Sequence, residues 1–162
     1  MPDEKSNFYF RTGGHLTELL QLAPLFPHYD SYFITEKQKN NLSLKEKYGK
    51  KKVFFMIPGT YTGMINKLKY PFILLLNTVI SFFAFIKIKP DCVVTTGAHN
   101  TVPMCFIAHK FHKRVIFIET FAALEKPTKA GSMVYKIADH FIIQWENMKQ
   151  FYPNAEYGGW IF

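Results

Sequence analysis

The chain has 162 residues, a formal net charge of +8 and 48% apolar residues, and aromatic side chains make up 17% of the chain. This composition excludes a disordered tail, a collagen and a disulfide-stapled miniprotein. One domain is expected at this length, and the chain is short for an enzyme that binds two substrates, which suggests one half of a two-part enzyme.

Short runs of β-branched or aromatic residues alternate with helical patterns along the chain. Strands are expected at 7–10, 31–35, 53–57, 92–95, 115–118 and 141–144. Helices are expected at 15–26, 71–87, 102–112, 129–137 and 146–152. This alternation predicts an α/β fold, a single Rossmann-like domain over 1–162 with a doubly wound parallel sheet. The uniformly apolar run 115–118 is typical of a central strand that is covered on both faces.

Positive charge is concentrated in the first part of the chain, because residues 1–90 carry a net charge of +7 and residues 91–162 carry +1. Residues 37–52 contain seven lysines and one acid, Glu46. They form either a solvated surface or a patch that meets anionic lipid headgroups, where each lysine is worth roughly 1 kcal/mol. Nucleic acid is not expected as a partner, since the chain has only two arginines, Arg11 and Arg114, and no recognised nucleic-acid motif.

An uncharged apolar run covers residues 70–86, within a hydrophobic helix expected at about 70–88. Its 17 residues would reach about 25 Å as a helix, which is short of the roughly 30 Å core of a bilayer. A span would also separate two strands of one sheet across the membrane. Asn77, Thr78 and Ser81 share one narrow stripe, so most of the helix surface is apolar.

Two interpretations of this helix remain open. It is either a crossover helix packed wholly within protein or a helix whose outer face rests in a membrane. In the second case Phe82, Phe83 and Phe85 would face the lipid, and Lys87 would extend its ammonium group toward the headgroups.

The first glycine-rich loop contains Thr12, Gly13, Gly14 and His15, between an expected strand and an expected helix. Glycines allow close approach of a ligand, and a helix N-terminus attracts an anionic oxygen, so this loop is a candidate for substrate binding. A purely structural turn is the alternative. His15 stands where the helix dipole favours a neutral imidazole, which suits a general base, although a polar residue at a helix start needs no such role.

A second loop of the same type follows the expected strand 92–95 and contains Thr96, Gly97, His99 and Asn100. The carboxyl ends of parallel strands share one edge of a doubly wound sheet, where such folds bind ligands. Glu119 follows the strand 115–118 and belongs to the same edge. It could orient a hydroxyl or share a proton with a histidine, or it could be a helix cap or a salt-bridge partner.

The two cysteines, Cys92 and Cys105, lie in apolar runs and are expected to be buried free thiols in a reducing cytoplasm. The polar start of the chain is not typical of a secretory signal. We expect no metal site from these residues.

Taken together, several stretches resemble the PssD-type bacterial polysaccharide-biosynthesis subunits, which are similar to the membrane-anchoring subunit of the eukaryotic UDP-GlcNAc transferase that acts on dolichol-diphosphate GlcNAc. The matching stretches are GGHLTELL (13–20), PDCVVTTGAHNTVPMCFIAHKF (90–111), VIFIETFA (115–122), residues 127–135 and IADHFIIQWENMKQFYPNAEYGG (137–159).

The resemblance implies the amino-terminal, acceptor-side half of a split GT-B glycosyltransferase, without a cofactor or a bound metal. A separate subunit would bind the UDP-sugar, and the acceptor would be a sugar on a polyprenyl diphosphate at the cytoplasmic face of the membrane. His15 is then the first candidate for the base that deprotonates the acceptor hydroxyl, with Glu119 and His99 as alternates. A non-catalytic membrane anchor that orients a soluble transferase is the alternative function.

Overall fold

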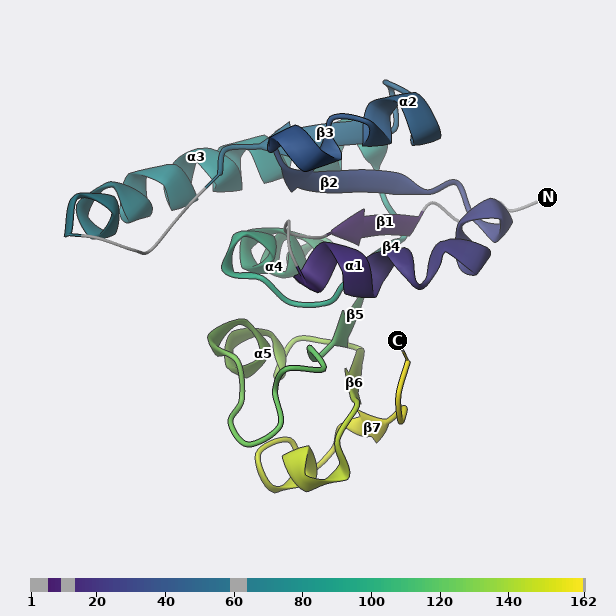
Figure 1. The fold of residues 1–162 in the computed structure, drawn as a ribbon, viewed down its shortest axis with the longest axis vertical. Coiled ribbons are helices and arrows are strands. Elements are labelled where there is room, and N and C mark those ends of the chain that lie inside the picture. The colour runs from purple at the N-terminus through teal and green to yellow at the C-terminus, as the bar shows by residue number, and fades with distance from the viewer. Residues whose placement is uncertain (1–5, 10–13, 59–63, 162) are drawn as a thin grey trace.

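The computed structural model describes residues 6–9, 14–58 and 64–161, and it contains one parallel sheet (Figure 1). The seven described strands lie in the order β3-β2-β1-β4-β5-β6-β7, and every pairing between them is parallel. Their bounds are Ser6–Tyr9 (β1), Tyr32–Glu36 (β2), Val53–Met56 (β3), Cys92–Thr95 (β4), Arg114–Ile118 (β5), His140–Ile143 (β6) and Glu156–Tyr157 (β7). The predicted doubly wound α/β sheet is confirmed.

The helices follow the predicted order with several changes at their ends. The α-helices are Gly14–Leu20 (α1), Leu44–Tyr48 (α2), Met64–Ile88 (α3), Val102–Lys110 (α4) and Lys129–Val134 (α5). The 3-10 helices are Ala23–His28 (η1), Lys39–Asn41 (η2), His99–Thr101 (η3) and Glu146–Gln150 (η4). The helix predicted at 15–26 is therefore α1 followed by η1, and Pro24 and Pro27 lie in the 3-10 segment, where they have no amide hydrogen to donate.

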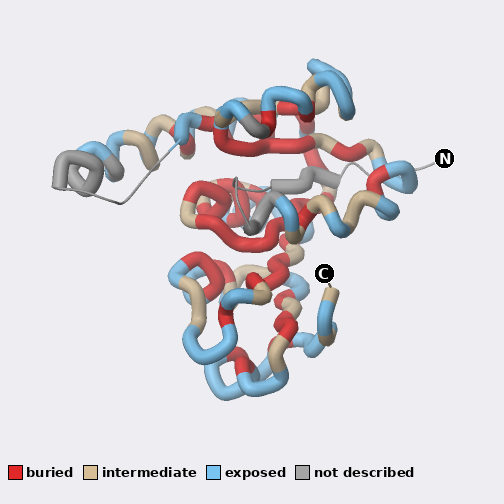
Figure 2. The backbone as a smooth tube through the Cα atoms, in the orientation of Figure 1, coloured by how far each residue is buried: buried red, intermediate tan, exposed pale blue. Residues whose placement is uncertain are grey.

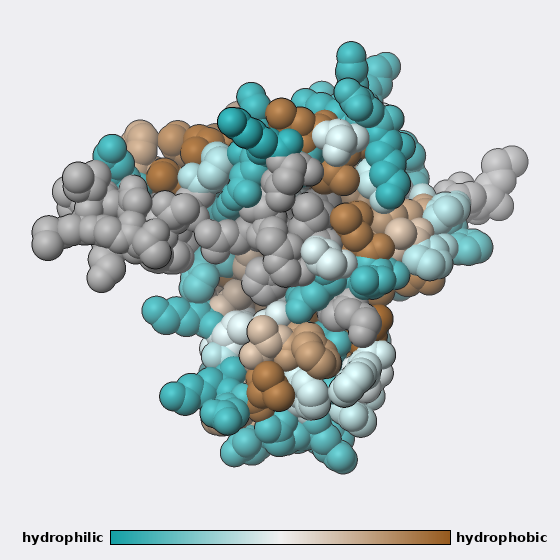
Figure 3. Space-filling model, in the orientation of Figure 1, coloured by the Kyte–Doolittle hydropathy of each residue, from teal (hydrophilic) through white to brown (hydrophobic). Residues whose placement is uncertain are grey.

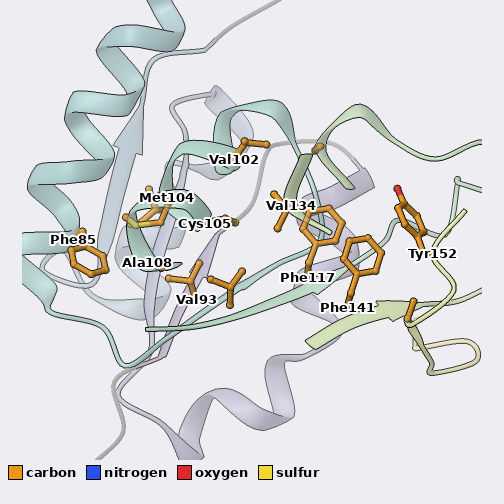
Figure 4. Close-up of a cluster of buried hydrophobic side chains, with 14 of the residues drawn as sticks. Phe85, Val93, Val102, Met104, Cys105, Ala108, Phe117, Val134, Phe141 and Tyr152 are labelled. Atoms are coloured by element: carbon orange, nitrogen blue, oxygen red, sulfur yellow. The ribbon is translucent and has the colours of Figure 1, made fainter. Parts of the chain in front are cut away.

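Strand β5 lies inside the sheet and is covered on both faces, as its apolar sequence predicts. Val115 and Phe117 are fully buried against a large core that also contains residues of α3, α4 and α5. Ile118 belongs to a second core with Leu19 of α1 and Phe26 of η1. Figure 4 shows the larger core, in which Phe117 and Phe141 stack at 4.9 Å between ring centres. In Figure 2 the buried segments include most of β2 and much of α4.

Helix α3 is the longest element, and its 25 residues extend about 38 Å, well past the end of the short strands (Figure 1). It begins seven residues before the predicted start at Pro71, which lies inside the helix. Its window Pro71–Ile88 is long and apolar enough to cross a membrane by length and composition alone, and 28% of that window is buried.

Both cysteines are buried and free, which confirms that prediction. Burial raises the pKa of Cys92 to about 11 and that of Cys105 to about 12, so both remain neutral thiols at physiological pH. The apolar carboxyl-terminal segment docks on the domain through Ile161, whose backbone N–H donates to Gln144 Oε1 at 3.3 Å. The short edge strand β7 was not predicted.

Candidate functional site

The carboxyl ends of β1, β2, β4 and β5 lie at one edge of the sheet, with β1 between β2 and β4. The strand order changes direction here, because β2 and β3 lie on one side of β1 and β4 to β7 lie on the other. Open α/β sheets bind ligands at such a point. Thr12 and Gly13, predicted to bind substrate, lie outside the described residues. Gly14 and His15 begin α1 at this edge, and the described part of His15 is its backbone.

The loop between β4 and α4 is built mainly from buried residues. Gly97 has a φ of +85°, and a Cβ at this position would stand 2.9 Å from the ring of Phe117. The Thr101 hydroxyl accepts from the backbone N–H of Ala98 at 3.3 Å and donates to its carbonyl at 2.7 Å. The loop therefore has one conformation that only glycine at 97 accommodates without strain.

The structure encloses three of the predicted site residues in this loop, and their part in substrate binding stays a prediction. Thr96, Gly97 and Asn100, which are predicted to bind substrate, are all buried. They form the framework that presents His99, which is half-buried, and they do not display side chains on an open surface. A single sequence shows which residues are small and polar but not which of them the fold encloses.

A buried carboxylate that the sequence analysis missed supports this loop from β2. Glu36 is 1% exposed, and the Asn100 amide donates to its Oε1. Asn41 donates to the carbonyl of Glu36 at 2.7 Å and to the Thr35 hydroxyl at 3.0 Å. The bond from Asn100 joins the end of β2 to the loop after β4, and these two strands flank β1 in the sheet. The sequence contained a signal for it, because Glu36 directly follows the expected strand 31–35, just as Glu119 follows the expected strand 115–118.

Glu119 is enclosed in a hydrogen-bond network, and its role as an alternate base stays a prediction. It is 1% exposed, and its oxygens accept from Tyr152 Oη at 3.0 Å and from Thr128 Oγ1 at 2.9 and 3.1 Å. Thr128 is the N-cap of α5, where its hydroxyl accepts from the Gly131 N–H. Burial raises the pKa of Glu119, and the hydrogen bonds from Thr128, Thr120 and Tyr152 oppose that shift.

Helix α1 is tied to the loop after β5 by a different carboxylate. Glu18 Oε1 accepts from the Thr120 hydroxyl at 2.7 Å and from the Phe121 N–H at 3.0 Å. Because Glu18 and His15 share α1, these bonds fix the helix start, and with it the His15 backbone, relative to the rest of the carboxyl edge.

Helix α3 turns its polar stripe toward the protein and an apolar face toward the outside. The Asn77 amide accepts from the Ile57 N–H and donates to the Ile57 carbonyl, both at 2.9 Å, and Asn77 and Ser81 are fully buried. The exposed apolar residues repeat at helical spacing, and they are Phe72, Leu75, Val79, Phe82, Phe83 and Ile86. Figure 3 shows apolar surface along this helix. Monomeric soluble domains rarely leave such a stripe uncovered.

Two of the residues predicted to face lipid therefore lie on the outer face, and one does not. Phe82 and Phe83 are 41% and 66% exposed, whereas Phe85 is 4% exposed and packs on Phe111 at 5.1 Å between ring centres. The prediction for Phe85 is wrong, because this residue faces α4. Lys87 is exposed and its ammonium lies 5.6 Å from the centre of the Phe54 ring. Contact of this face with lipid stays a prediction.

A groove of about 610 Å³ opens between α3, α4 and α5, and His99 forms part of its wall. Its other lining residues are Leu74, Thr78, Val102, Pro103, Phe106, Ile107, Lys110, Lys129 and Met133. The described residues that the sequence predicts as functional thus lie in three places: the loops at the carboxyl edge of the sheet, the wall of the apolar groove and the exposed face of α3. Within the described ranges, no cluster of three or more His, Cys, Asp or Glu side chains has metal-site geometry.

Comparison with known proteins places the chain in a family. Residues 9–161 match the family model described as Oligosaccharide biosynthesis protein Alg14 like. The chain belongs to the Alg14-like family. Its relatives include the UDP-N-acetylglucosamine transferase subunit ALG14 of Mus musculus, 26% identical over 93% of this chain and 79% of the mouse protein. The Homo sapiens protein of the same name is 32% identical over 51% of this chain and 41% of its own length.

Solved structures similar to this Alg14-like chain are GT-B proteins, which confirms the predicted Rossmann-like half-domain. MurG of Acinetobacter baumannii superposes with a TM-score of 0.71 at 17% identity, over 89% of this chain and 42% of that one. The UDP-GlcNAc 2-epimerase of Methanocaldococcus jannaschii superposes with a TM-score of 0.66 at 15% identity, over 90% of this chain and 41% of that one. The chain therefore spans less than half the length of these structures, and at such identities the likeness shows the fold alone.

Proposed function

We propose that this Alg14-like chain is the acceptor-binding, membrane-associating subunit of a two-component glycosyltransferase. The enzyme moves a sugar, N-acetylglucosamine by analogy with the relatives, from a UDP-sugar to a sugar on a polyprenyl diphosphate. The observation that carries this proposal is the family match over residues 9–161, together with relatives named as UDP-N-acetylglucosamine transferase subunits. A separate UDP-sugar-binding subunit is the partner.

The exposed apolar face of α3 supports the membrane association. It places large side chains such as Phe72 and Phe83 in the outer position while the polar Asn77 faces the sheet. The helix lies along the surface of the cytoplasmic leaflet in this proposal, because β3 and β4, which precede and follow it, both belong to one sheet.

The chemistry is an inverting transfer in which His15 is the base. Its imidazole takes the proton of the acceptor hydroxyl while that oxygen forms a bond to the anomeric carbon of the donor sugar. The bond from this carbon to the phosphate breaks, and UDP leaves with the electron pair. Of the alternates, Glu119 is buried in a structural network and His99 lines the apolar groove, so His15 is the strongest candidate.

The test compares His15→Ala with His109→Ala in the presence of the partner subunit. General base catalysis contributes about 10²–10⁴-fold, so His15→Ala is expected to lower kcat by that factor and to leave vesicle flotation unchanged. His109 is exposed near the end of α4 and serves as the matched histidine control. Unchanged turnover in His15→Ala, with flotation intact, would remove the catalytic role and leave the non-catalytic anchor as the function.

A further inference from the structure

The groove between α3, α4 and α5 has an apolar interior. Leu74, Val102, Ile107 and Met133 supply aliphatic or thioether surface. The one hydroxyl in the wall, that of Thr78, donates to the Leu74 carbonyl at 2.8 Å and needs no partner from a ligand. A volume of about 610 Å³ is within the range of pockets that bury one small ligand. A hydrocarbon chain is the ligand class that this lining accepts at the lowest desolvation cost.

The charges around the groove stand at its ends. Lys129 is the first residue of α5 and lies with His99 at the carboxyl edge of the sheet. Lys110 is the last residue of α4 and lies at the opposite end. Glu119 is enclosed beneath α5, so no acid is among the groove-lining residues. The groove therefore complements an apolar chain that carries an anionic group.

The groove is also continuous with the outer face of α3. Leu74 lines it, and the next residue on the helix, Leu75, is 61% exposed on the outer face. Phe106 and Met133, on the opposite wall, are 43% and 52% exposed. A chain that leaves the groove would thus pass directly onto apolar surface rather than into water.

We infer that this groove holds the isoprenoid segment nearest the headgroup of a polyprenyl diphosphate, with the diphosphate at the end formed by Lys129 and His99. The inference rests on the proposed function, which supplies the lipid class. The position of α1 decides which end of the groove holds the diphosphate, because the sugar beyond the diphosphate must reach the carboxyl edge where α1 begins. The rest of the chain would continue along α3 into the membrane.

The test measures binding of farnesyl diphosphate, below its micelle concentration, to the isolated chain by titration calorimetry. Leu74→Trp fills the groove and is expected to weaken binding at least tenfold. Leu42→Trp places the same ring at an exposed leucine between η2 and α2, outside the groove lining, and is expected to bind normally. Met133→Trp provides a second filling variant at an exposed position, which keeps the test valid if Leu74→Trp fails to fold.

The charge at the headgroup end is tested separately. Lys129→Ala is expected to weaken binding of farnesyl diphosphate about fivefold. Lys136→Ala removes an exposed charge outside the groove and should have no effect. Farnesol is expected to bind more weakly than farnesyl diphosphate, and inorganic diphosphate alone is expected not to bind measurably.

Two results would overturn the inference: equal affinity of both filling variants and wild type, or dihexanoyl phosphatidic acid binding as tightly as farnesyl diphosphate. The second result would make the groove a general lipid site. These failures are distinct from failure of the proposed function. If wild type transfers sugar with its partner while the filling variants bind and transfer normally, only the groove assignment is lost. If farnesyl diphosphate binds in the groove but no transfer occurs with the partner, the proposed function is lost.

Discussion

Gly131→Ala is predicted to destabilise the fold through the network around Glu119. A Cβ at Gly131 would overlap Glu119 Oε2 and stand 2.6 Å from Tyr152 Oη and 3.0 Å from Thr128 Oγ1. Overpacking a core costs about 1–3 kcal/mol, and losing one hydrogen bond to a charged group costs about 1.5–3 kcal/mol. A total near 3 kcal/mol lowers Tm by about 6–12 °C for a domain of this size.

Thermal unfolding followed by circular dichroism measures this loss, with Lys136→Ala on the exposed surface as the control. Tyr152→Phe removes the hydroxyl that the new methyl group would meet, so the double variant Gly131→Ala with Tyr152→Phe is expected to lose less than the two single losses added together. A Tm for Gly131→Ala within about 1 °C of wild type would refute the reasoning, and so would strict additivity in the double variant.

Three further predictions follow from the described contacts. Burial raises the pKa of Glu119 above its usual 4.5, so the stability that the protonated carboxyl contributes is present below that pH and is lost as pH rises through the pKa of the folded state. Glu119→Gln should therefore show a smaller fall in unfolding free energy between about pH 4 and pH 7 than wild type, measured by urea titration. Asn77→Ala removes both bonds to the Ile57 backbone and should cost about 2–4 kcal/mol in the same assay, whereas a loss under about 0.5 kcal/mol would contradict that contact. Phe83→Ser should reduce vesicle flotation with an unchanged Tm, because Phe83 is exposed. Phe85→Ser should cost about 3–5 kcal/mol of stability, because Phe85 is buried. Loss of stability in Phe83→Ser and loss of flotation alone in Phe85→Ser would show that the two faces of α3 are wrongly assigned.

The strand pattern could be predicted because it depends on local residue types. The predicted strand at 92–95 has the observed bounds, and the apolar run 115–118 forms a strand covered on both faces. The edge strand β7 could not be predicted, because its two residues lie beside glycines and gain their conformation from pairing with β6. Helix ends shifted for a similar reason, since tertiary contacts rather than propensity decide where the last turns stop.

The candidate site was harder to predict than the fold, because burial depends on elements that are distant in the sequence. The phenylalanines of α3 have the same hydropathy, so the residue type does not show which of them faces inward. The bonds of Asn77 to Ile57 and the contact of Phe85 with Phe111 show the inward face. Glu119 lies at the predicted edge, but Thr128 and Tyr152, which enclose it, come from later segments. The acidic side chain could be found from the sequence, but its hydrogen-bond partners could not.

The most direct test of the proposed function is a transfer assay with two purified components on vesicles. The UDP-sugar-binding partner is mixed with labelled UDP-GlcNAc and a polyprenyl-diphosphate GlcNAc acceptor, with and without this chain. The account predicts labelled disaccharide lipid only when both proteins are present, and loss of product when His15→Ala replaces wild type. Equal product formation by the partner without this chain would contradict the account.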